Sequence, residues 1–136
     1  MSYALDTNVV AAALNGETRV VARLSTLAPE DIVLPTPVLA ELVFGARLSA
    51  RAAENLAKVE RLAATLRTAP FNLGAARRFG EIKGRLRRQG RTKQDFDLAI
   101  ASIALEQGAV LVTHDAALLD GDIPDLVVED WLATTA

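Results

Sequence analysis

The segment from Asp97 to Asp115 restricts the possible fold more than any other part of the sequence. It begins with the apolar periodicity of a helix, is interrupted by Gly108, and continues as an apolar run from Val110 to Thr113. Glycine commonly follows the last turn of a helix, and a short apolar run rich in valine predicts a buried strand. The segment therefore predicts a helix followed by a strand, with a carboxylate near each end.

Asp97 is predicted to point toward the protein rather than toward water. At about 100° per residue it shares a helical stripe with Ile100 and Ala104, whereas Glu106 lies on the opposite side next to Ser102, which predicts the solvent face there. A charged carboxylate in an apolar setting is costly unless an opposite charge pairs with it. The chain has a single histidine and its basic residues lie elsewhere in the sequence, so a metal ion is an attractive partner.

Strands and helices alternate along the chain, which is typical of a parallel sheet with helices on both faces. We therefore predict an α/β fold, a three-layer α/β/α sandwich with a mostly parallel sheet, as one domain over residues 1–136. Helix starts are marked by Thr36 before Pro37 and by a capping box from Thr92 to Asp95. Strands are expected at 3–6, 32–34, 110–113 and 126–128, helices at 9–14, 18–27, 37–48, 49–66 and 74–88, an extended link at 70–71, and Trp131 against the sheet edge.

Four acids lie where a shared site would form. Asp6 and Asp115 each end a predicted strand, and Glu41 and Asp97 lie on helix stripes that are predicted to be buried, Glu41 in a helix that is apolar nearly all round. Sites in parallel sheets form beyond the carboxyl ends of strands. Converging carboxylates repel each other, so either their pKa values rise or a cation binds between them. An all-oxygen ligand set suits Mg²⁺ or Mn²⁺ rather than Zn²⁺, and a metal-bound water is a nucleophile at neutral pH.

Basic residues are concentrated in one segment. Between Arg77 and Lys93 there are eight basic residues and one acid, and no lysine or arginine follows Lys93. Such asymmetry suggests a polyanionic partner, although a charged helix face can also be merely solvated. The apolar stripe of this helix leaves several arginines facing outward as candidate contacts to RNA or to a protein partner: Arg78, Arg85 and Arg88, with Arg91 in the following loop.

Composition excludes several classes of protein. The chain has no cysteine, which excludes disulfides and thiolate metal sites. It shows no signal peptide and no apolar run near the ~20 residues that span a bilayer, so no membrane association and a cytoplasmic location are expected. Its aromatic content is too low for a base-stacking platform, so RNA recognition would depend on backbone charge and shape.

Four short motifs follow one another along the chain: Leu5 to Asn8, Ala40 to Leu42, Asp97 to Ala101 and Leu111 to Asp115. Their order and spacing resemble those of PIN-domain nucleases, most closely the VapC toxins of toxin–antitoxin pairs. The resemblance covers essentially the whole chain and implies a Mg²⁺- or Mn²⁺-dependent endoribonuclease that forms a homodimer and is neutralised by a small VapB-type antitoxin.

Carried over residue by residue, the resemblance makes Asp6, Glu41, Asp97 and Asp115 the catalytic and metal-binding acids. It also implies supporting roles beside them for Thr7, Asn8 and Thr113. The chain departs from the family at His114, where asparagine is common, and we interpret this histidine as a surface or supporting residue rather than a metal ligand.

Plainer interpretations exist for the same residues. Asp6 could cap the following helix, Asp115 could be a turn residue, and Glu41 could reach water at a sheet edge. Asp95 suits a capping position, and the acids at 120, 122 and 125 suit solvated loop charges. Two other functions also fit the pattern: a catalytically inactive RNA- or protein-binding module on the same fold, and phosphotransfer through an aspartyl-phosphate at Asp6. The second lacks a general acid because the residue two positions on is Asn8.

Overall fold

A parallel five-stranded sheet forms the centre of the protein in this computed structural model, which describes residues 1–134. The strands are β1 (Tyr3–Leu5), β2 (Ile32–Pro35), β3 (Arg67–Ala69), β4 (Val110–Val112) and β5 (Val128–Glu129). Their order in the sheet is β3-β2-β1-β4-β5, and every neighbouring pair is parallel. β1 therefore occupies the middle of the sheet, although it is the first strand of the chain.

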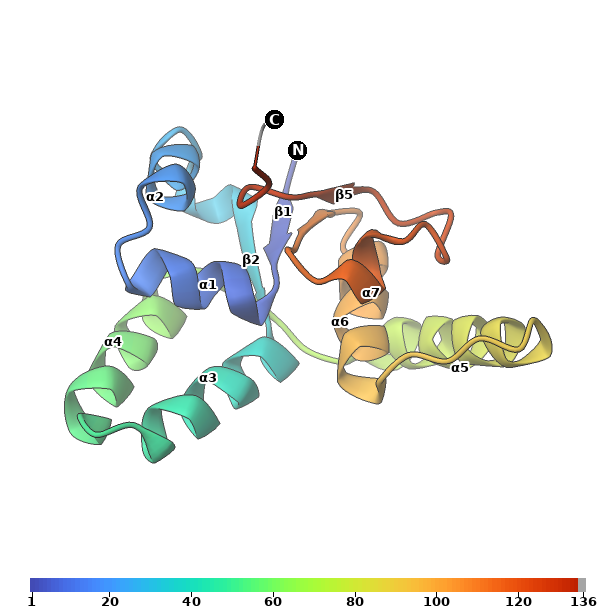
Figure 1. The fold of residues 1–136 in the computed structure, drawn as a ribbon, viewed down its shortest axis with the longest axis horizontal. Helices are drawn as coiled ribbons and strands as arrows, with labels where there is room; N and C mark the ends of the chain where they lie inside the picture. Colours follow the sequence, from blue (N-terminus) through green and yellow to red (C-terminus); the bar gives the residue numbers. More distant parts are fainter. Residues whose placement is uncertain (135–136) are drawn as a thin grey trace.

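Helices cover both sides of this sheet. In the view of Figure 1 the first four α-helices lie on one side of β1 and β2, and the last three lie on the other. This arrangement confirms the predicted α/β/α sandwich with a parallel sheet. The helices are α1 (Thr7–Leu14), α2 (Thr18–Ser25), α3 (Thr36–Leu48), α4 (Ala52–Thr65), α5 (Leu73–Arg88), α6 (Asp95–Glu106) and α7 (Ala116–Leu119), with a 3₁₀ turn η1 (Pro29–Asp31) before β2.

The inner strands form the core. Val33 and Leu34 of β2 and Leu111 and Val112 of β4 are fully buried, because helices cover both faces of the sheet at these strands. Leu5 at the end of β1 is buried with them. An all-apolar run such as 110–112 is the pattern expected of such a strand, which explains why its position could be predicted.

The strand order changes direction at β1. The chain runs outward from β1 to β2 and β3 on one side, and then returns to place β4 and β5 on the other side. Connections leave the neighbouring strands β1 and β4 in opposite directions, so a crevice opens beyond their carboxyl ends. Asp6 follows β1 directly, and residues 113–115 follow β4. The topology thus brings Asp6, from the first acidic motif, close to Asp115, from the last.

Helix α3 differs from its prediction. Its apolar sequence predicted a buried helix, but Phe44 is 66% exposed and Leu48 is 72% exposed. The helix begins at Thr36 after Pro35 rather than being capped by Thr36. It packs on α1 and α4 through one face, and no other element of residues 1–134 buries Phe44 or Leu48. The prediction of burial all round was therefore wrong for the outward face.

Strand β3 was not predicted. Only Ala69 of this three-residue strand is buried, and Arg67 and Thr68 are exposed, as is usual for an edge strand. The segment lacks an apolar run, and only an extended link at 70–71, directly after it, was predicted. β3 is a strand because its backbone pairs with β2. The side-chain pattern of the sequence gives no sign of that pairing.

The start and outer face of α6 also differ from expectation. Gln94 is the N-cap residue and makes no side-chain cap hydrogen bond, whereas the Asp95 carboxylate lies 2.8 Å from Lys83 Nζ. The predicted capping box is therefore wrong. The face of α6 that carries Ser102 was predicted to meet solvent, but α5 packs along α6 there and Ser102 is fully buried. The Ser102 hydroxyl donates to Leu98 O at 2.6 Å. Within residues 1–134 no helix is long and apolar enough to cross a bilayer.

Candidate acidic site beyond β1 and β4

Asp6 is held by two hydrogen bonds at the end of β1. It is 4% exposed, its Oδ1 accepts the Thr7 N–H at 2.8 Å, and its Oδ2 accepts the Thr113 hydroxyl at 2.7 Å. The structure thus shows Asp6 as the N-cap of α1, as the plainer interpretation had it. A carboxylate offers about four lone-pair sites, so these two bonds leave acceptor capacity on both oxygens. Capping α1 and binding a cation are therefore compatible.

Thr7 joins the first acid to the second. Its backbone supports Asp6, and its hydroxyl donates to Glu41 Oε1 at 2.6 Å. Glu41 is half-buried on α3, which packs directly against α1. The hydrogen bond through Thr7 therefore brings Glu41, from a helix on one side of the sheet, close to the strand ends.

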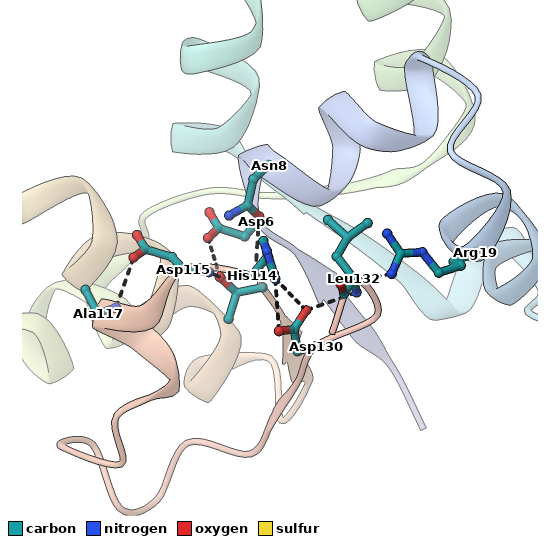
Figure 2. A network of polar contacts seen from close by, with 9 residues as sticks. Asp6, Asn8, Arg19, His114, Asp115, Ala117, Asp130 and Leu132 are labelled. Atoms are coloured by element: carbon teal, nitrogen blue, oxygen red, sulfur yellow. Dashed lines mark hydrogen bonds and ion pairs between the residues drawn. The ribbon is translucent and has the colours of Figure 1, made fainter. Parts of the chain in front are cut away.

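Thr113 makes the corresponding link after β4. This residue is fully buried, its hydroxyl donates to Asp6, and the same oxygen accepts the Asp115 N–H at 3.0 Å. Asp115 in turn is the N-cap of α7 and accepts the Ala117 N–H at 3.0 Å. Figure 2 shows Asp6 and Asp115 on the two adjacent strand ends, each with its hydrogen-bond partners. Serine or threonine at position 113 is needed for this link, because a hydroxyl can donate and accept at once.

Asp97 completes the group from the first turn of α6. It lines an open cavity of about 540 Å³ together with Glu41 and Asp115. The rest of the wall consists of Thr92, Lys93, Gln94 and Ala117. The acids of α3, α6 and the β4–α7 junction thus face one cavity, and Asp6 lies buried behind it.

The pKa values of two of these acids are raised. Burial, followed by the negative charges of Asp115, Asp6 and Glu41, raises the pKa of Asp97 from 3.8 to about 6. Burial also raises the pKa of Asp6, with hydrogen bonds from Thr113 and Thr7 opposing the rise and the charges of Glu41 and Asp115 adding to it. Each acid is close enough to affect the others, so the sequence-predicted quartet converges.

The residues fit a hard divalent cation that keeps part of its water shell. Within residues 1–134 no three acidic or histidine side chains are grouped tightly enough to ligate one ion together. Mg²⁺ is commonly bound through one or two carboxylates and several waters, which requires no tighter grouping. The donor set consists of carboxylate oxygens with free lone pairs, and a cation would offset the repulsion that raises the pKa of Asp97. Glu41, Asp97 and Asp115 line the cavity in which such a cation would lie, and Asp6 is coupled to Asp97 by charge.

His114 faces away from the acids. Its side chain is 51% exposed, its Nδ1 lies 3.0 Å from both carboxylate oxygens of Asp130, and its backbone N–H donates to Asn8 Oδ1 at 3.4 Å. In Figure 2 the imidazole is turned toward Asp130. Asn8 therefore supports the chain after β4 rather than Asp6 itself.

Lys93 is the residue that sequence reasoning missed. It was grouped with distant basic residues, yet its side chain is 2% exposed and lines the cavity beside Asp97. No local pattern could have found it, because Lys93 lies before the helix and its acidic partners lie in the loop after α7. Its partners Asp120 and Asp122 were predicted to be solvated loop charges, but both lie within ion-pair distance of Lys93.

The basic segment is partly neutralised. Arg78 pairs with Glu106 at 2.9 Å and Arg91 pairs with Asp122 at 2.5 Å. Arg85 was expected to face outward, but its Nη2 is buried and makes no hydrogen bond to the described part of the chain. Arg88 is exposed as expected. Two of the four candidate contact arginines therefore already have acidic partners within the protein.

Comparison with known families agrees with this geometry. The PIN-domain family matches residues 3–123 of the chain. The match spans the strands and helices that carry all four acids, from Asp6 to Asp115. The chain therefore belongs to the PIN-domain family.

Its relatives of known name are VapC proteins. It is 32% identical to ribonuclease VapC1 of Haemophilus influenzae over 133 residues, covering 96% of this chain and 98% of the relative. It is 28% identical to the tRNA(fMet)-specific endonuclease VapC of Shigella flexneri over 131 residues, with the same coverage. Among solved structures, VapBC2 of Rickettsia felis bound to a promoter DNA fragment matches with a TM-score of 0.86 and 31% identity, covering 96% of this chain and 99% of that one.

Proposed function

We propose that this protein is a metal-dependent endoribonuclease and the toxin of a VapBC-type toxin–antitoxin pair. The observation that supports the chemistry is the convergence of Asp6, Glu41, Asp97 and Asp115 at the carboxyl ends of β1 and β4, with raised pKa values at Asp6 and Asp97. The similarity to VapC ribonucleases over nearly the whole chain supports the substrate class.

Different residues of the site have different proposed roles in phosphodiester hydrolysis. Asp6, Asp97 and Asp115 would hold Mg²⁺ or Mn²⁺, which lowers the pKa of bound water and stabilises the charge that develops on the phosphate. Thr7 and Thr113 fix the Asp6 carboxylate, so that it does not need to reorganise during the reaction. Glu41, held by Thr7, adds a negative charge at the rim of the cavity. With a pKa near 6, Asp97 is mostly ionised at neutral pH and protonates in mild acid.

Arginines of α5 and the loop after it are proposed to hold the RNA backbone. Arg85 has a buried nitrogen without a partner in the described chain, and Arg88 is exposed at the end of α5. Arg78 and Arg91 would have to leave Glu106 and Asp122 to contribute. Affinity for RNA would then fall with added salt, as expected for contacts to phosphates.

A VapB-type antitoxin is the proposed protein partner. A groove of about 310 Å³ between α1, α3 and α4 ends at Glu41 and Thr7. Its floor is largely apolar, with Leu14, Leu42 and Val59, which suits an apolar peptide segment. A basic side chain at the end of that segment would meet the acids as a metal ion does. The related structures of Rickettsia felis and Salmonella typhimurium are toxin–antitoxin complexes, which supports this partner.

The exposed face of α3 is the proposed contact between two copies of the chain in a homodimer. Phe44 and Leu48 are large apolar side chains that point to water in the single chain. Burying two such side chains from each copy would contribute about 1.5–3 kcal/mol per side chain.

Phosphotransfer through Asp6 fits the structure poorly. The side chain is nearly fully buried and does not line the cavity, so a phosphoryl group in the cavity has poor access to it for in-line attack. Asn8, two residues on, accepts a hydrogen bond from the His114 backbone and has no proton to give as a general acid. No observation favours an inactive binding module over the nuclease, since all four acids are present and converge.

Cleavage of total cellular RNA by the purified protein tests the proposal. The protein is first freed of co-purified antitoxin by unfolding and refolding, and is then assayed with Mg²⁺, with Mn²⁺ and with EDTA. We expect cleavage that requires the metal and is lost in Asp6→Asn and Asp97→Asn. Asp95→Asn is the matched control, because it makes the same change two residues away at an exposed carboxylate that pairs with Lys83. Metal-dependent cleavage retained in both site variants would contradict the assignment.

A further inference from the structure

The side chain of Lys93 is buried and has acidic partners. Its ammonium donates to the backbone oxygen of Ala117 and to Asp120 Oδ2 at 2.7 Å, and forms an ion pair with Asp122 Oδ2 at 3.4 Å. Only 2% of its side chain is exposed. A buried ammonium is costly unless hydrogen bonds and opposite charges compensate it, and these contacts supply both. Such a residue is unlike the exposed pairs at the surface, which contribute little.

The hydrogen bonds of Lys93 join two elements that carry acids of the site. Lys93 lies two residues before α6, whose first turn carries Asp97. Ala117 belongs to α7, whose N-cap is Asp115. α7 has only four residues, and its own backbone bonds run from the N–H groups of Leu118 and Leu119 to Asp115 O. A single turn has little stability by itself, so the position of Asp115 depends on what anchors α7.

The surrounding charges strengthen this anchor. Burial alone would raise the pKa of Asp120, but the hydrogen bond and charge of Lys93 bring it below the ordinary value. Arg91 holds the other oxygen of Asp122 at 2.5 Å. The loop after α7 is thus held to the loop before α6 by two basic residues and two acids.

Lys93 also faces the cavity of the site. It lines the same wall as Asp97 and Asp115, and its positive charge is the one influence that opposes the raised pKa of Asp97. A lysine in this place could act on the acids in two ways, by holding them in position or by its charge alone. If Lys93 acts by position, its removal weakens cation binding. If it acts by its charge alone, its removal strengthens cation binding.

We propose that Lys93 is a positioning residue for the reaction, which holds Asp115 opposite Asp97 by joining the loop before α6 to α7. The proposal rests on the proposed nuclease function for its consequence in catalysis. The link itself follows from the hydrogen bonds of Lys93 and can be measured without RNA.

The test replaces Lys93 by methionine, which keeps the length of the side chain and removes its charge and its donors. We expect faster hydrogen exchange at the amides of Leu118 and Leu119, about tenfold weaker binding of Mn²⁺ measured by calorimetry without RNA, and a kcat about 10–100-fold lower with little change in KM for RNA. Lys93→Arg retains a charge and several donors and is expected to recover part of the Mn²⁺ affinity. Lys83→Met, at an exposed pair with Asp95, is the matched control and is expected to leave all three measurements unchanged.

The direction of the change in Mn²⁺ affinity decides between the two roles. Removing a positive charge beside a cation site strengthens binding if position is unaffected, so tighter Mn²⁺ binding in Lys93→Met would overturn the proposal. Unchanged exchange at Leu118 and Leu119 would overturn it as well. If Lys93→Met does not fold, Asp120→Asn removes one acceptor at a half-exposed position and is expected to shift exchange and Mn²⁺ affinity in the same direction by less. Wild-type protein that cuts no RNA, while the variants shift exchange as expected, would contradict the nuclease function and leave the link intact.

Discussion

The repulsion between the four acids is compensated differently at Asp97 and at Asp6. Asp6 has hydrogen bonds from Thr113 and Thr7 that favour its ionised form. Asp97 has none that lowers its pKa, and its nearest compensating charge is Lys93. The repulsion between the acids is therefore least compensated at Asp97, where protonation near pH 6 relieves it. This difference makes Asp97 the residue whose replacement reports most directly on the charge of the site.

Asp97→Asn is expected to stabilise the metal-free protein at neutral and alkaline pH. The folded protein binds the Asp97 proton more tightly than the unfolded chain does, because the folded pKa is about 6 and the ordinary value is 3.8. Stability is therefore lost as pH rises through this window. After allowance for the partial exposure of Asp97, the variant should be more stable than wild type by about 1 kcal/mol at about pH 8. Urea unfolding in EDTA measures this gap, and a gap that does not close near about pH 4 would contradict the assigned cause.

Thr113→Val is expected to destabilise the fold and to impair cleavage. Valine has the shape of threonine but leaves Asp6 Oδ2 buried without its donor, which costs about 1–3 kcal/mol. The pKa of Asp6 should rise further, because the Thr113 hydroxyl favours the ionised form. The loss of stability should then shrink in acid, where Asp6 is protonated in both variants. Unfolding measured against pH tests this, with Thr113→Ser, which keeps the hydroxyl, as the control.

The site could be predicted in part from single residues. Asp6 and Asp115 follow apolar runs, and strand ends in a parallel sheet are where sites form. The contacts of Lys93 could not be predicted, because Asp120 lies 27 residues away, in a loop without a periodic pattern. For Asp95 the local sequence pattern predicted a capping role, but in the structure its carboxylate forms a tertiary ion pair with Lys83.

At the scale of elements, α3 shows what apolar periodicity does and does not predict. Its sequence is apolar nearly all round, but only Val38, Leu42 and Ala46 are buried, so apolar composition alone does not say which face the chain covers. Val38 and Leu42 face the core of the chain, whereas Phe44 and Leu48 face outward. The proposed second copy of the chain would cover the outward face. β3 is the converse, a strand made by pairing with β2 without any apolar pattern of its own.

Replacing Phe44 and Leu48 together by glutamine is expected to convert a dimer into a monomer. Both side chains are exposed in the single chain, so the stability of the monomer should change by less than about 0.5 kcal/mol per site. Sedimentation equilibrium measures the change in mass. Val21→Gln, at another exposed apolar residue on α2, is the control and should leave the mass unchanged. A double variant that remains dimeric would place the interface elsewhere.

At the scale of the whole molecule, the fold brings four acids together beyond the carboxyl ends of the inner strands, although the net charge of the chain is only −2. The alternation of strands and helices was enough to predict the parallel sheet and its two helical layers. It was not enough to predict the strand order, since nothing in the pattern says that β1 lies between β2 and β4. That order is what places the acids of the first and last motifs together.

Binding of Mn²⁺ is expected to stabilise the whole molecule against heat. A ligand at 100 times its Kd that binds only the folded state contributes about 2.7 kcal/mol, which corresponds to a rise in Tm of about 8 °C for a domain of this size. Differential scanning calorimetry measures the shift, with NaCl of equal ionic strength as the control. The shift should be largely lost in Asp97→Asn. An equal shift in that variant would show that the ion binds away from the acids.

The hydrogen bond between Thr113 and Asp6 joins positions 107 residues apart, across the central pair of strands. During synthesis the first strand leaves the ribosome long before its neighbour β4 exists, and contacts of such high sequence separation form late in folding. The acidic site therefore cannot assemble on the nascent chain until residues 110–115 have emerged. If the chain is the nuclease proposed above, it would become active only when most of its own synthesis is complete.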